Sequence, residues 1–423
     1  MAAVRPHDYE ARENALARSV QPLSVEDFLA NYWQRAPLLT VRNGSAEFAD
    51  IVDMDEFDAI IAGTGLRHPY FRIFDDGAPL PVGMTTTSRQ LGPDLDSGLA
   101  DLDAVYQHHA NGATIVLQAM ERWWPKFQQF CRDFELAFGF PTQAHAYLTP
   151  PHARGAPVHY DTHDVFVLQV QGSKRWRVWE PVKRLPMRMS EDVYEPSAVQ
   201  AQTEEKQPLI DVELRAGDSL YLPRGYIHEV TTDRHRSLHV TVSVMVYRWA
   251  DLAEAVISDH LVKLRDVVEY RESLPYGRVP FGPPDRKLSD HYAKLVDDFL
   301  SGLDLASGEE LMRSRLVSYI APSWRGRFLD VQRASELTLD QPVFVRSDTV
   351  YRISATESTI TLTVGSTAVE FDIRFAPAIR HVVAAQSFTA GDLSSDLTDA
   401  ERLDLTRRLV QLGLCTLGKE WQS

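Results

Sequence analysis

Two histidines and an aspartate in this sequence have the residue types and spacing of a metal site. His159 and Asp161 stand two apart in "HYDTHDVFVLQVQGSKRW", so on a strand both side chains would point to one face. His228 follows a Gly-Asp turn and a short strand in "AGDSLYLPRGYIHEV". Two imidazoles and one carboxylate on one face of an octahedral ion leave three positions open, as in non-haem Fe(II) sites. The three residues therefore predict a metal centre with room for a bidentate co-substrate and dioxygen.

Other interpretations of these residues stay open. A chain with 14 histidines contains an HxD pair by chance, and most such pairs are solvated. Zinc competes with iron, because two histidines and a carboxylate also serve zinc hydrolases, although no HExxH helix supports it. We expect the other histidines of the region to be partly exposed or hydrogen-bonded within the β core, namely His152, His163, His235 and His239.

Lys174, in "QGSKRW", is the candidate anchor for an anionic co-substrate. If it lies just past a hairpin turn, strand alternation would point its ammonium into a barrel, where the far carboxylate of a dicarboxylate would lie. The simpler interpretation is an exposed hairpin lysine. A shift of one residue in register would give the role to Arg175 or Arg177.

These residues need a β framework, and the sequence predicts one from about Thr114 to Tyr247. Residues 24–35 before it predict a helix with Ser24 as N-cap, followed by a strand at 36–42. Pro, Gly and Asp turns separate the β-rich runs, which are "ATIVLQAM", "AHAYLTP", "DVFVLQVQGSKRWRVWEP", "DSLYLP" and "SLHVTVSVMVYRW".

Beyond Ala250 the apolar periodicity becomes helical. Residues 250–274 and 285–303 predict amphipathic helices on either side of the Pro- and Gly-rich breaker 275–285. Their apolar faces would form a dimer or pack on the chain's own barrel. From about Ser335 the pattern is mixed, with strands expected at 342–347 and 358–365 and helices at 378–386 and 397–415.

Length and composition limit the function classes. A chain of 423 residues predicts two or three domains. The net charge of −15 disfavours sequence-independent binding to nucleic acid. The negative charge either suits a basic partner or serves solubility alone. Cys131 and Cys415 have no CxxC neighbour, which fits a reducing cytoplasm. The charged start and the lack of a long apolar run predict a chain that is neither secreted nor membrane-spanning.

The run "AHAYLTPPHARGAPVHYDTHDVFVLQVQGSKRWRVW", with "GDSLYLPRGYIHEV" and "SLHVTVS", resembles the JmjC ribosomal oxygenases of the cupin superfamily. "FLANYWQRAPLL" is similar to that family's N-terminal segment. The resemblance spans most of the chain, with specific motifs in the core and weak ones beyond residue 250. It implies an α+β fold with a double-stranded β-helix (jelly-roll, JmjC/cupin) core. The implied domains are a catalytic domain with an N-terminal helical segment at 1–250, a helical dimerisation region at 251–334 and a winged-helix-like domain at 335–423.

The resemblance also implies roles for individual residues. His159, Asp161 and His228 would be the iron ligands, and Lys174 would bind the C5 carboxylate of 2-oxoglutarate. Tyr147 would face the co-substrate and substrate pocket. The residues that correspond to a substrate-contacting serine of the family are Ser237, Thr241 and Ser243.

One residue departs from the family pattern. His145 stands where the histidyl hydroxylases of the family carry an asparagine that helps to hold the target imidazole. An imidazole is bulkier and changes its charge near neutral pH. This departure disfavours a ribosomal-protein histidine as substrate, and leaves open an arginine, another side chain or another peptide.

The implied function is hydroxylation of a protein side chain with Fe(II), 2-oxoglutarate and O2. A basic ribosomal protein is among the candidate substrates, and the chain would act as a cytoplasmic homodimer without direct binding to nucleic acid or membrane. The alternatives are an oxygenase of the same core acting on a small molecule or biosynthetic peptide, and a non-catalytic metal-binding cupin. A lysyl demethylase is also conceivable, although nothing in the sequence indicates a methyl-lysine cage. Winged helices often bind DNA, but the alternating charge of "DAERLDLTRRL" indicates a protein contact or packing role.

Overall fold

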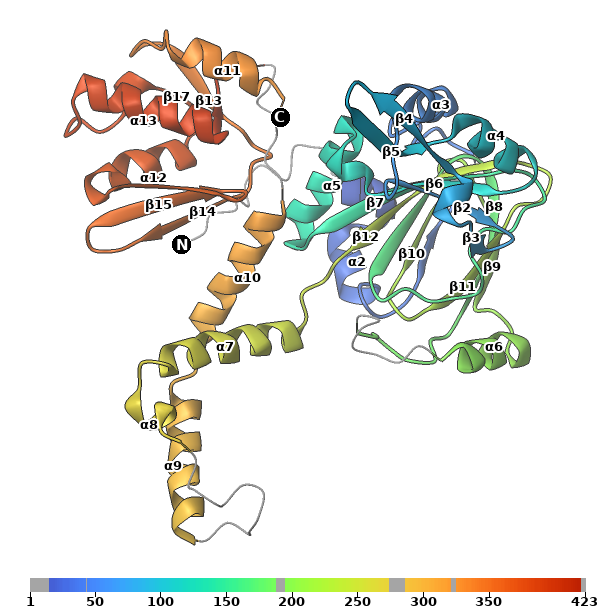
Figure 1. The fold of residues 1–423 in the computed structure, drawn as a ribbon, viewed down its shortest axis with the longest axis horizontal. Coiled ribbons are helices and arrows are strands. Elements are labelled where there is room, and N and C mark those ends of the chain that lie inside the picture. Colours follow the sequence, from blue (N-terminus) through green and yellow to red (C-terminus); the bar gives the residue numbers. More distant parts are fainter. Residues whose placement is uncertain (1–14, 43, 188–194, 274–285, 321–324, 420–423) are drawn as a thin grey trace. The chain divides into compact units, whose positions relative to one another are not determined.

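The structure is a computed structural model that describes residues 15–42, 44–187, 195–273, 286–320 and 325–419. Most of the charged start and the breaker at 275–285 lie outside these residues. The chain forms two compact units that divide between Val246 and Tyr247 (Figure 1). The domain boundary expected after residue 334 stays a prediction.

The first unit combines helices with a large antiparallel sheet. Its second helix begins as the sequence predicts, because the Ser24 side chain accepts a hydrogen bond from the backbone of Asp27. The helices are α1 Ala15–Val20, α2 Val25–Asn31, α3 Met54–Gly63, α4 Leu102–Ala110, α5 Pro125–Phe138 and α6 Pro196–Glu205, with 3₁₀ turns at Val82–Met84 and Met120–Arg122. The strands are β1 Leu38–Thr40, β2 Phe71–Asp75, β3 Ala78–Pro79, β4 Thr86–Leu91, β5 Asp94–Ala100, β6 Thr114–Leu117, β7 Thr142–Thr149, β8 Asp164–Trp179, β9 Ile210–Arg215, β10 Ser219–Leu222, β11 Ile227–Thr231 and β12 Ser237–Val244.

The strand order is that of a double-stranded β-helix. The major sheet runs β1-β10-β8-β12-β7-β6-β2-β3, and β9 and β11 pair with the far half of β8. One long strand therefore belongs to both sheets. This confirms the expected double-stranded β-helix core, whereas β4 and β5 form a separate hairpin.

A hairpin expected at "QGSK" is wrong, because β8 is one continuous strand of 16 residues. Its first half pairs with β10 and β12, and its second half pairs with β9 and β11. The passage from one sheet to the other occurs at Gly172, which has φ +67°. A Cβ there would collide with the carbonyl oxygen of Arg236, so only glycine fits.

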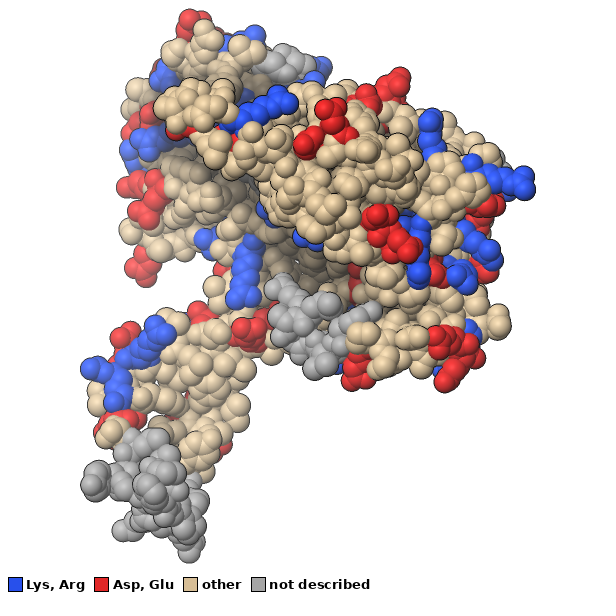
Figure 2. Space-filling view, turned by 45° about the vertical axis from the view of Figure 1, so that its right-hand side comes forward, with Lys and Arg blue, Asp and Glu red and all other residues tan. Residues whose placement is uncertain are grey.

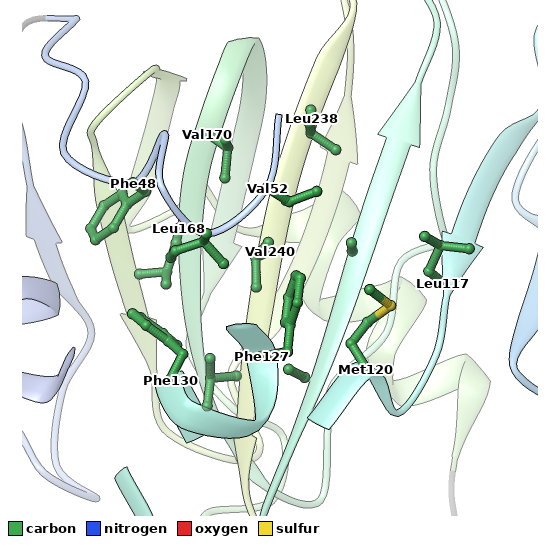
Figure 3. Packing of buried hydrophobic residues seen from close by; sticks show 14 of the residues in the cluster. Phe48, Val52, Leu117, Met120, Phe127, Phe130, Leu168, Val170, Leu238 and Val240 are labelled. Carbon is green, nitrogen blue, oxygen red and sulfur yellow. The ribbon is translucent and has the colours of Figure 1, made fainter. Parts of the chain in front are cut away.

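Alternate side chains of the major sheet face two different environments. On β7 and β12 the even-numbered apolar residues are buried against the helices, whereas His145, Tyr147, His239, Thr241 and Ser243 face the barrel interior. Helix α5 was not foreseen among the β signals, and it covers the outer face (Figure 3). It begins with Pro125, ends at Gly139 in the left-handed conformation and buries Phe127, Phe130 and Phe134. The helices thus close the outer core and leave the interior for the site.

The second unit has its own apolar core. Its strands form one sheet in the order β17-β13-β18 and another in the order β14-β15-β16. The expected strands at 342–347 and 358–365 and the expected helices at 285–303, 378–386 and 397–415 are confirmed, whereas the helix expected at 250–274 is interrupted after Leu264. No described helix has the length and apolarity needed to cross a membrane. The helices are α7 Trp249–Leu264, α8 Val268–Arg271, α9 Arg286–Ser301, α10 Leu305–Tyr319, α11 Arg327–Ala334, α12 Ala376–Ala384 and α13 Asp399–Leu412, with 3₁₀ turns at Ile373–Phe375 and Ala390–Asp392. The strands are β13 Pro342–Val345, β14 Tyr351–Ala355, β15 Thr359–Val364, β16 Thr367–Asp372, β17 Ser387–Thr389 and β18 Cys415–Thr416.

Candidate functional site

The three residues expected to bind metal converge in the structure. One ligand atom from each of His159, Asp161 and His228 lies within 4.8 Å of the other two. The Asp161 carboxylate is 3.9 Å from Nε2 of His159 and 3.7 Å from Nε2 of His228. The two imidazole rings lie 4.3 Å apart, between centroids. This is the spacing that three ligands need around one ion.

Backbone contacts set the orientation of both histidines. His159 and His228 face each other across an isolated antiparallel bridge, with backbone hydrogen bonds of 3.2 and 2.8 Å. Nδ1 of His159 lies 2.6 Å from the carbonyl oxygen of Pro157, and Nδ1 of His228 lies 3.1 Å from that of Tyr226. A carbonyl can only accept, so both Nδ1 atoms carry the proton and both Nε2 lone pairs are left for a metal.

The electrostatics keep Asp161 and His228 in the states that bind metal. Burial opposes ionisation of Asp161, but His163, His159 and His228 together bring its pKa below the ordinary value. Burial lowers the pKa of His228 to about 4, and the neighbouring His159 adds to this effect. An ionised carboxylate and a neutral imidazole are the forms that a divalent cation requires.

Lys174 points into the barrel, and a β-bulge is the reason. The partners of Leu238 and His239 on β8 are Gln171 and Gln169, so β8 carries one extra residue at this point. The extra residue reverses which side chains face inward. Before the bulge the interior receives Val165 and Val167, and after it Lys174 and Trp176.

The arginines that competed with Lys174 face outward. Arg175 pairs with Asp211 at 2.7 Å, and Arg177 pairs with Glu229. Lys174 is 1% exposed, and its ammonium donates a 2.9 Å hydrogen bond to the Thr149 hydroxyl. Among the described residues no carboxylate lies within ion-pair distance of it. Burial therefore lowers its pKa to about 7.

The triad and Lys174 line one cavity of about 610 Å³. Tyr147 and His145 on β7 and Thr241 and Ser243 on β12 line it as well. Ser237 does not, because it lies beyond the bulge and accepts a 2.9 Å hydrogen bond from Gln169. The structure thus brings together all the expected site residues except Ser237.

Two of the histidines for which we expected no role beyond the β core, His163 and His239, also line this cavity. Nε2 of His163 is 3.9 Å from the Asp161 carboxylate. His239 is buried and stacks on Tyr147, with ring centroids 4.7 Å apart. Thr149, the partner of Lys174, was missed altogether. Alternation along β12 from Thr241 could have placed His239 inside, whereas the pairing of Thr149 with Lys174 has no local signal in the sequence.

The residues present fit both groups that the resemblance implies. Two neutral imidazoles and a carboxylate with open space beside them match the donor set of Fe(II) oxygenase sites. A buried ammonium without a counter-ion is costly, and the carboxylate of a dicarboxylic acid would balance it.

Comparison with known proteins agrees with this arrangement. Residues 118–252 match the JmjC domain family. The chain is 33% identical over 263 residues to ribosomal oxygenase 1 of Gallus gallus, covering 60% of this chain and 41% of that protein. It is 29% identical over 311 residues to the bifunctional lysine-specific demethylase and histidyl-hydroxylase NO66 of Drosophila melanogaster, covering 71% and 43%. It is 30% identical over 255 residues to the NO66 protein of Drosophila pseudoobscura pseudoobscura, and this match covers 60% of this chain and 25% of that protein. The chain therefore spans a quarter to under half of the length of these relatives.

The fold also matches a solved structure over most of the chain. The Escherichia coli ribosomal oxygenase YcfD, in complex with cobalt and 2-oxoglutarate, aligns with a TM-score of 0.54 and 20% identity. The alignment covers 93% of this chain and 98% of that one. The resemblance seen in the sequence is thus confirmed: residues 118–252 match the JmjC domain family, the relatives include proteins named as ribosomal oxygenases, and the fold is similar to that of YcfD.

Proposed function

We propose that this chain is an Fe(II)- and 2-oxoglutarate-dependent oxygenase that hydroxylates a side chain of a protein or peptide. One observation carries the proposal: a His-His-Asp triad lines the same cavity as a buried lysine that has no counter-ion among the residues that the structure describes. The names of the relatives, ribosomal oxygenase and histidyl-hydroxylase, support a protein substrate.

His159, Asp161 and His228 would hold the iron. When Fe(II) and 2-oxoglutarate are bound, they supply the oxidation of an unactivated carbon by O2, with succinate and CO2 as co-products. The protein contributes orientation and exclusion of water. Val165 and Trp176, which line the cavity, provide apolar surface for this.

Lys174 would bind the far carboxylate of 2-oxoglutarate, with the Thr149 hydroxyl beside it. Residues 153–159 cover this end of the cavity, because they run along β11 and hydrogen-bond to it through Gly155 and His159. A Cβ built at Gly155 would lie 3.3 Å from Nζ of Lys174. The segment therefore leaves little space for water around the ammonium.

His145 would contact the substrate. Burial lowers its pKa to about 4, so the imidazole is neutral. Its Nδ1 accepts a hydrogen bond from the backbone of Ala119 at 3.4 Å, which leaves the proton on Nε2. A donor at this place favours a substrate group that accepts a hydrogen bond. That favours an amide, an imidazole or a hydroxyl over a guanidinium, which only donates. The proposed preference is therefore the reverse of the one expected from the sequence, where His145 disfavoured a histidine substrate and left an arginine open.

The test is to incubate the purified full chain with Fe(II), 2-oxoglutarate, O2 and a ribosomal protein extract. We expect succinate and the mass gain of one oxygen atom on a defined tryptic peptide, which should be missing from a deletion strain. His159→Ala should abolish both products and Arg175→Met, at an outward-facing neighbour of Lys174, should keep them. Succinate without any modified peptide would indicate a small-molecule substrate. Metal and co-substrate binding without succinate would indicate a binding protein, and formaldehyde release would indicate demethylation.

The second unit supports a homodimer. Exposed apolar side chains lie along its helical part, including Leu261 and Val262 on α7, Val268 on α8 and Leu300 on α9. Packing against a second copy would bury this surface. Light scattering should give twice the chain mass, and Leu261→Glu should yield monomer. A monomeric parent chain would contradict the proposal.

The remaining assignments rest on the sequence. The region from residue 335 onward would be winged-helix-like, as the family resemblance implies. It would contact protein and not nucleic acid, because acidic and basic side chains are interspersed on the visible face (Figure 2) and the chain is acidic. A cytoplasmic location stays a proposal, on the cysteine argument alone.

A further inference from the structure

A buried ion pair joins the two strand ends next to the triad, and the proposed chemistry does not use it. Arg224 donates a 3.0 Å hydrogen bond to one carboxylate oxygen of Asp164, and the Tyr221 hydroxyl donates one of 2.8 Å to the other. The side chains of Asp164 and Arg224 are 0% and 7% exposed. A carboxylate held at both oxygens has a single orientation.

The ion pair lies between two metal ligands. Asp164 is the first residue of β8 and follows the short segment that carries Asp161, which belongs to no strand. Arg224 is in the turn that leads from β10 to His228 on β11. The amide of Gly225, next to Arg224, donates a 2.9 Å hydrogen bond to the backbone carbonyl of Asp161.

The turn has little freedom to move. Gly225 has φ +94°, and a Cβ there would lie 2.6 Å from the carbonyl oxygen of Lys183. On the other side, the Tyr221 hydroxyl accepts a 2.9 Å hydrogen bond from the backbone of Gln34, and its ring packs edge-on against Phe28 at 4.9 Å. The ion pair is thus fixed to the core that α2 covers.

We infer that Asp164 and Arg224 are positioning residues for the metal centre. They hold the segment of Asp161 at a fixed place relative to the strand of His228. The backbone bridge between His159 and His228 fixes the positions of those two ligands. Asp161 lies outside any strand ladder, so its position depends on the Asp164–Arg224 ion pair and on the hydrogen bond from the Gly225 amide. A buried ion pair adds little net stability compared with apolar residues of the same size, so a role in geometry accounts for its presence better than a role in stability.

The inference rests on the proposed metal site, and metal binding tests it without catalysis. The metal-free full chain is titrated with Co(II), followed by visible absorption, which reports both affinity and ligand geometry. Asp164→Asn keeps the shape of the side chain but removes its charge. We expect about tenfold weaker Co(II) binding, as for other residues that orient ligands, together with a changed spectrum. Tyr221→Phe removes one hydrogen bond and should weaken binding about threefold.

The matched control is a second buried ion pair far from the site in sequence. Asp330 and Arg346, in the other unit, lie 2.9 Å apart and are both 1% exposed. Asp330→Asn should lower the unfolding temperature but leave Co(II) affinity and spectrum unchanged. Equal weakening by Asp330→Asn, or unchanged binding in a folded Asp164→Asn chain, would overturn the inference.

If Asp164→Asn does not fold, unchanged binding by Tyr221→Phe overturns it. A parent chain that binds no Co(II) would refute the metal site itself, and the positioning role with it.

Discussion

Raising the pH from 6 to 8 should weaken the binding of 2-oxoglutarate about tenfold, because the charge on Lys174 is lost over this range. Burial lowers the pKa of Lys174 to about 7. One unit above that pKa, about a tenth of the lysine is charged in the co-substrate-free protein. The bound carboxylate favours the charged form, so the complex must take up close to one proton at pH 8. Below the pKa the lysine is already charged, and affinity should change little.

Calorimetry under nitrogen, with Mn(II) in place of Fe(II), measures this directly. Titration of 2-oxoglutarate in buffers of different ionisation enthalpy gives both the Kd and the number of protons taken up. Burial keeps the pKa of His228 and of His145 at about 4, so neither titrates in this range. Lys174→Arg keeps a permanent charge and should flatten the profile. Arg175→Met, the outward-facing control, should retain it. A parent Kd that is the same at pH 6 and pH 8 would refute the reasoning.

The same lysine predicts a stability effect without any ligand. Its folded-state pKa lies below the unfolded value of 10.5, so burial of the charge destabilises the folded chain. The cost is fully present below about pH 7 and disappears as the pH rises toward 10.5. Lys174→Met should therefore stabilise the ligand-free protein by up to about 5 kcal/mol at pH 6 and about 2 kcal/mol at pH 9. Urea unfolding at the two pH values checks the difference. A gain that does not shrink with pH would show that Lys174 is not buried as a charge.

Three further changes test other parts of the cavity. Gly155→Ala places a Cβ 3.0 Å from Cγ2 of Val230 and 3.3 Å from Nζ of Lys174. The 2-oxoglutarate Kd, measured by calorimetry, should therefore rise about tenfold. An unchanged Kd would show that residues 153–159 can move to accommodate the methyl group. Thr149→Val removes the hydroxyl that Lys174 binds and should raise the same Kd by roughly three- to tenfold, and a smaller effect would mean that the hydroxyl is not part of the anion site. His145→Ala should leave Co(II) and 2-oxoglutarate affinity intact but lower the yield of hydroxylated peptide by mass spectrometry; a loss of Co(II) binding instead would place His145 in the metal site.

The candidate metal ligands could be picked out from the sequence because residue types and the HxD spacing are local signals, but the strand expected to carry His159 and Asp161 is wrong: His159 lies in an isolated bridge and Asp161 in no strand. His159 and Asp161 are two residues apart, and a turn residue pattern before His228 places that residue at a strand start. The helix at 24–35 and the later helices were similarly predictable, since capping residues and apolar spacing act within a few turns.

The direction of Lys174 could not be read from the sequence. Alternation counted from Val165 places Arg175 inside and Lys174 outside. The bulge opposite Leu238 and His239 reverses this, and it depends on pairing with a strand more than sixty residues away in the chain. Gly172 was the available signal, and a hairpin turn explained it equally well. Long-range pairing also hid Thr149, whose contact with Lys174 joins β7 to β8.

The pairing of β11 gives a physical reason why the lysine and the triad would bind the same small molecule. His228 lies opposite Val178 on β8, and Val230 lies opposite Trp176. His228 and Val230 share a face and are separated by about 7 Å along the strand, which is comparable to the length of a five-carbon dicarboxylate. Val230 is at the lysine end, because a Cβ built at Gly155 would lie 3.0 Å from Cγ2 of Val230 and 3.3 Å from Nζ of Lys174. One strand thus spans the distance from the metal ligands to the buried ammonium. A dicarboxylate with one end at each place would fill this length, whereas a shorter acid would leave the charge on Lys174 unbalanced.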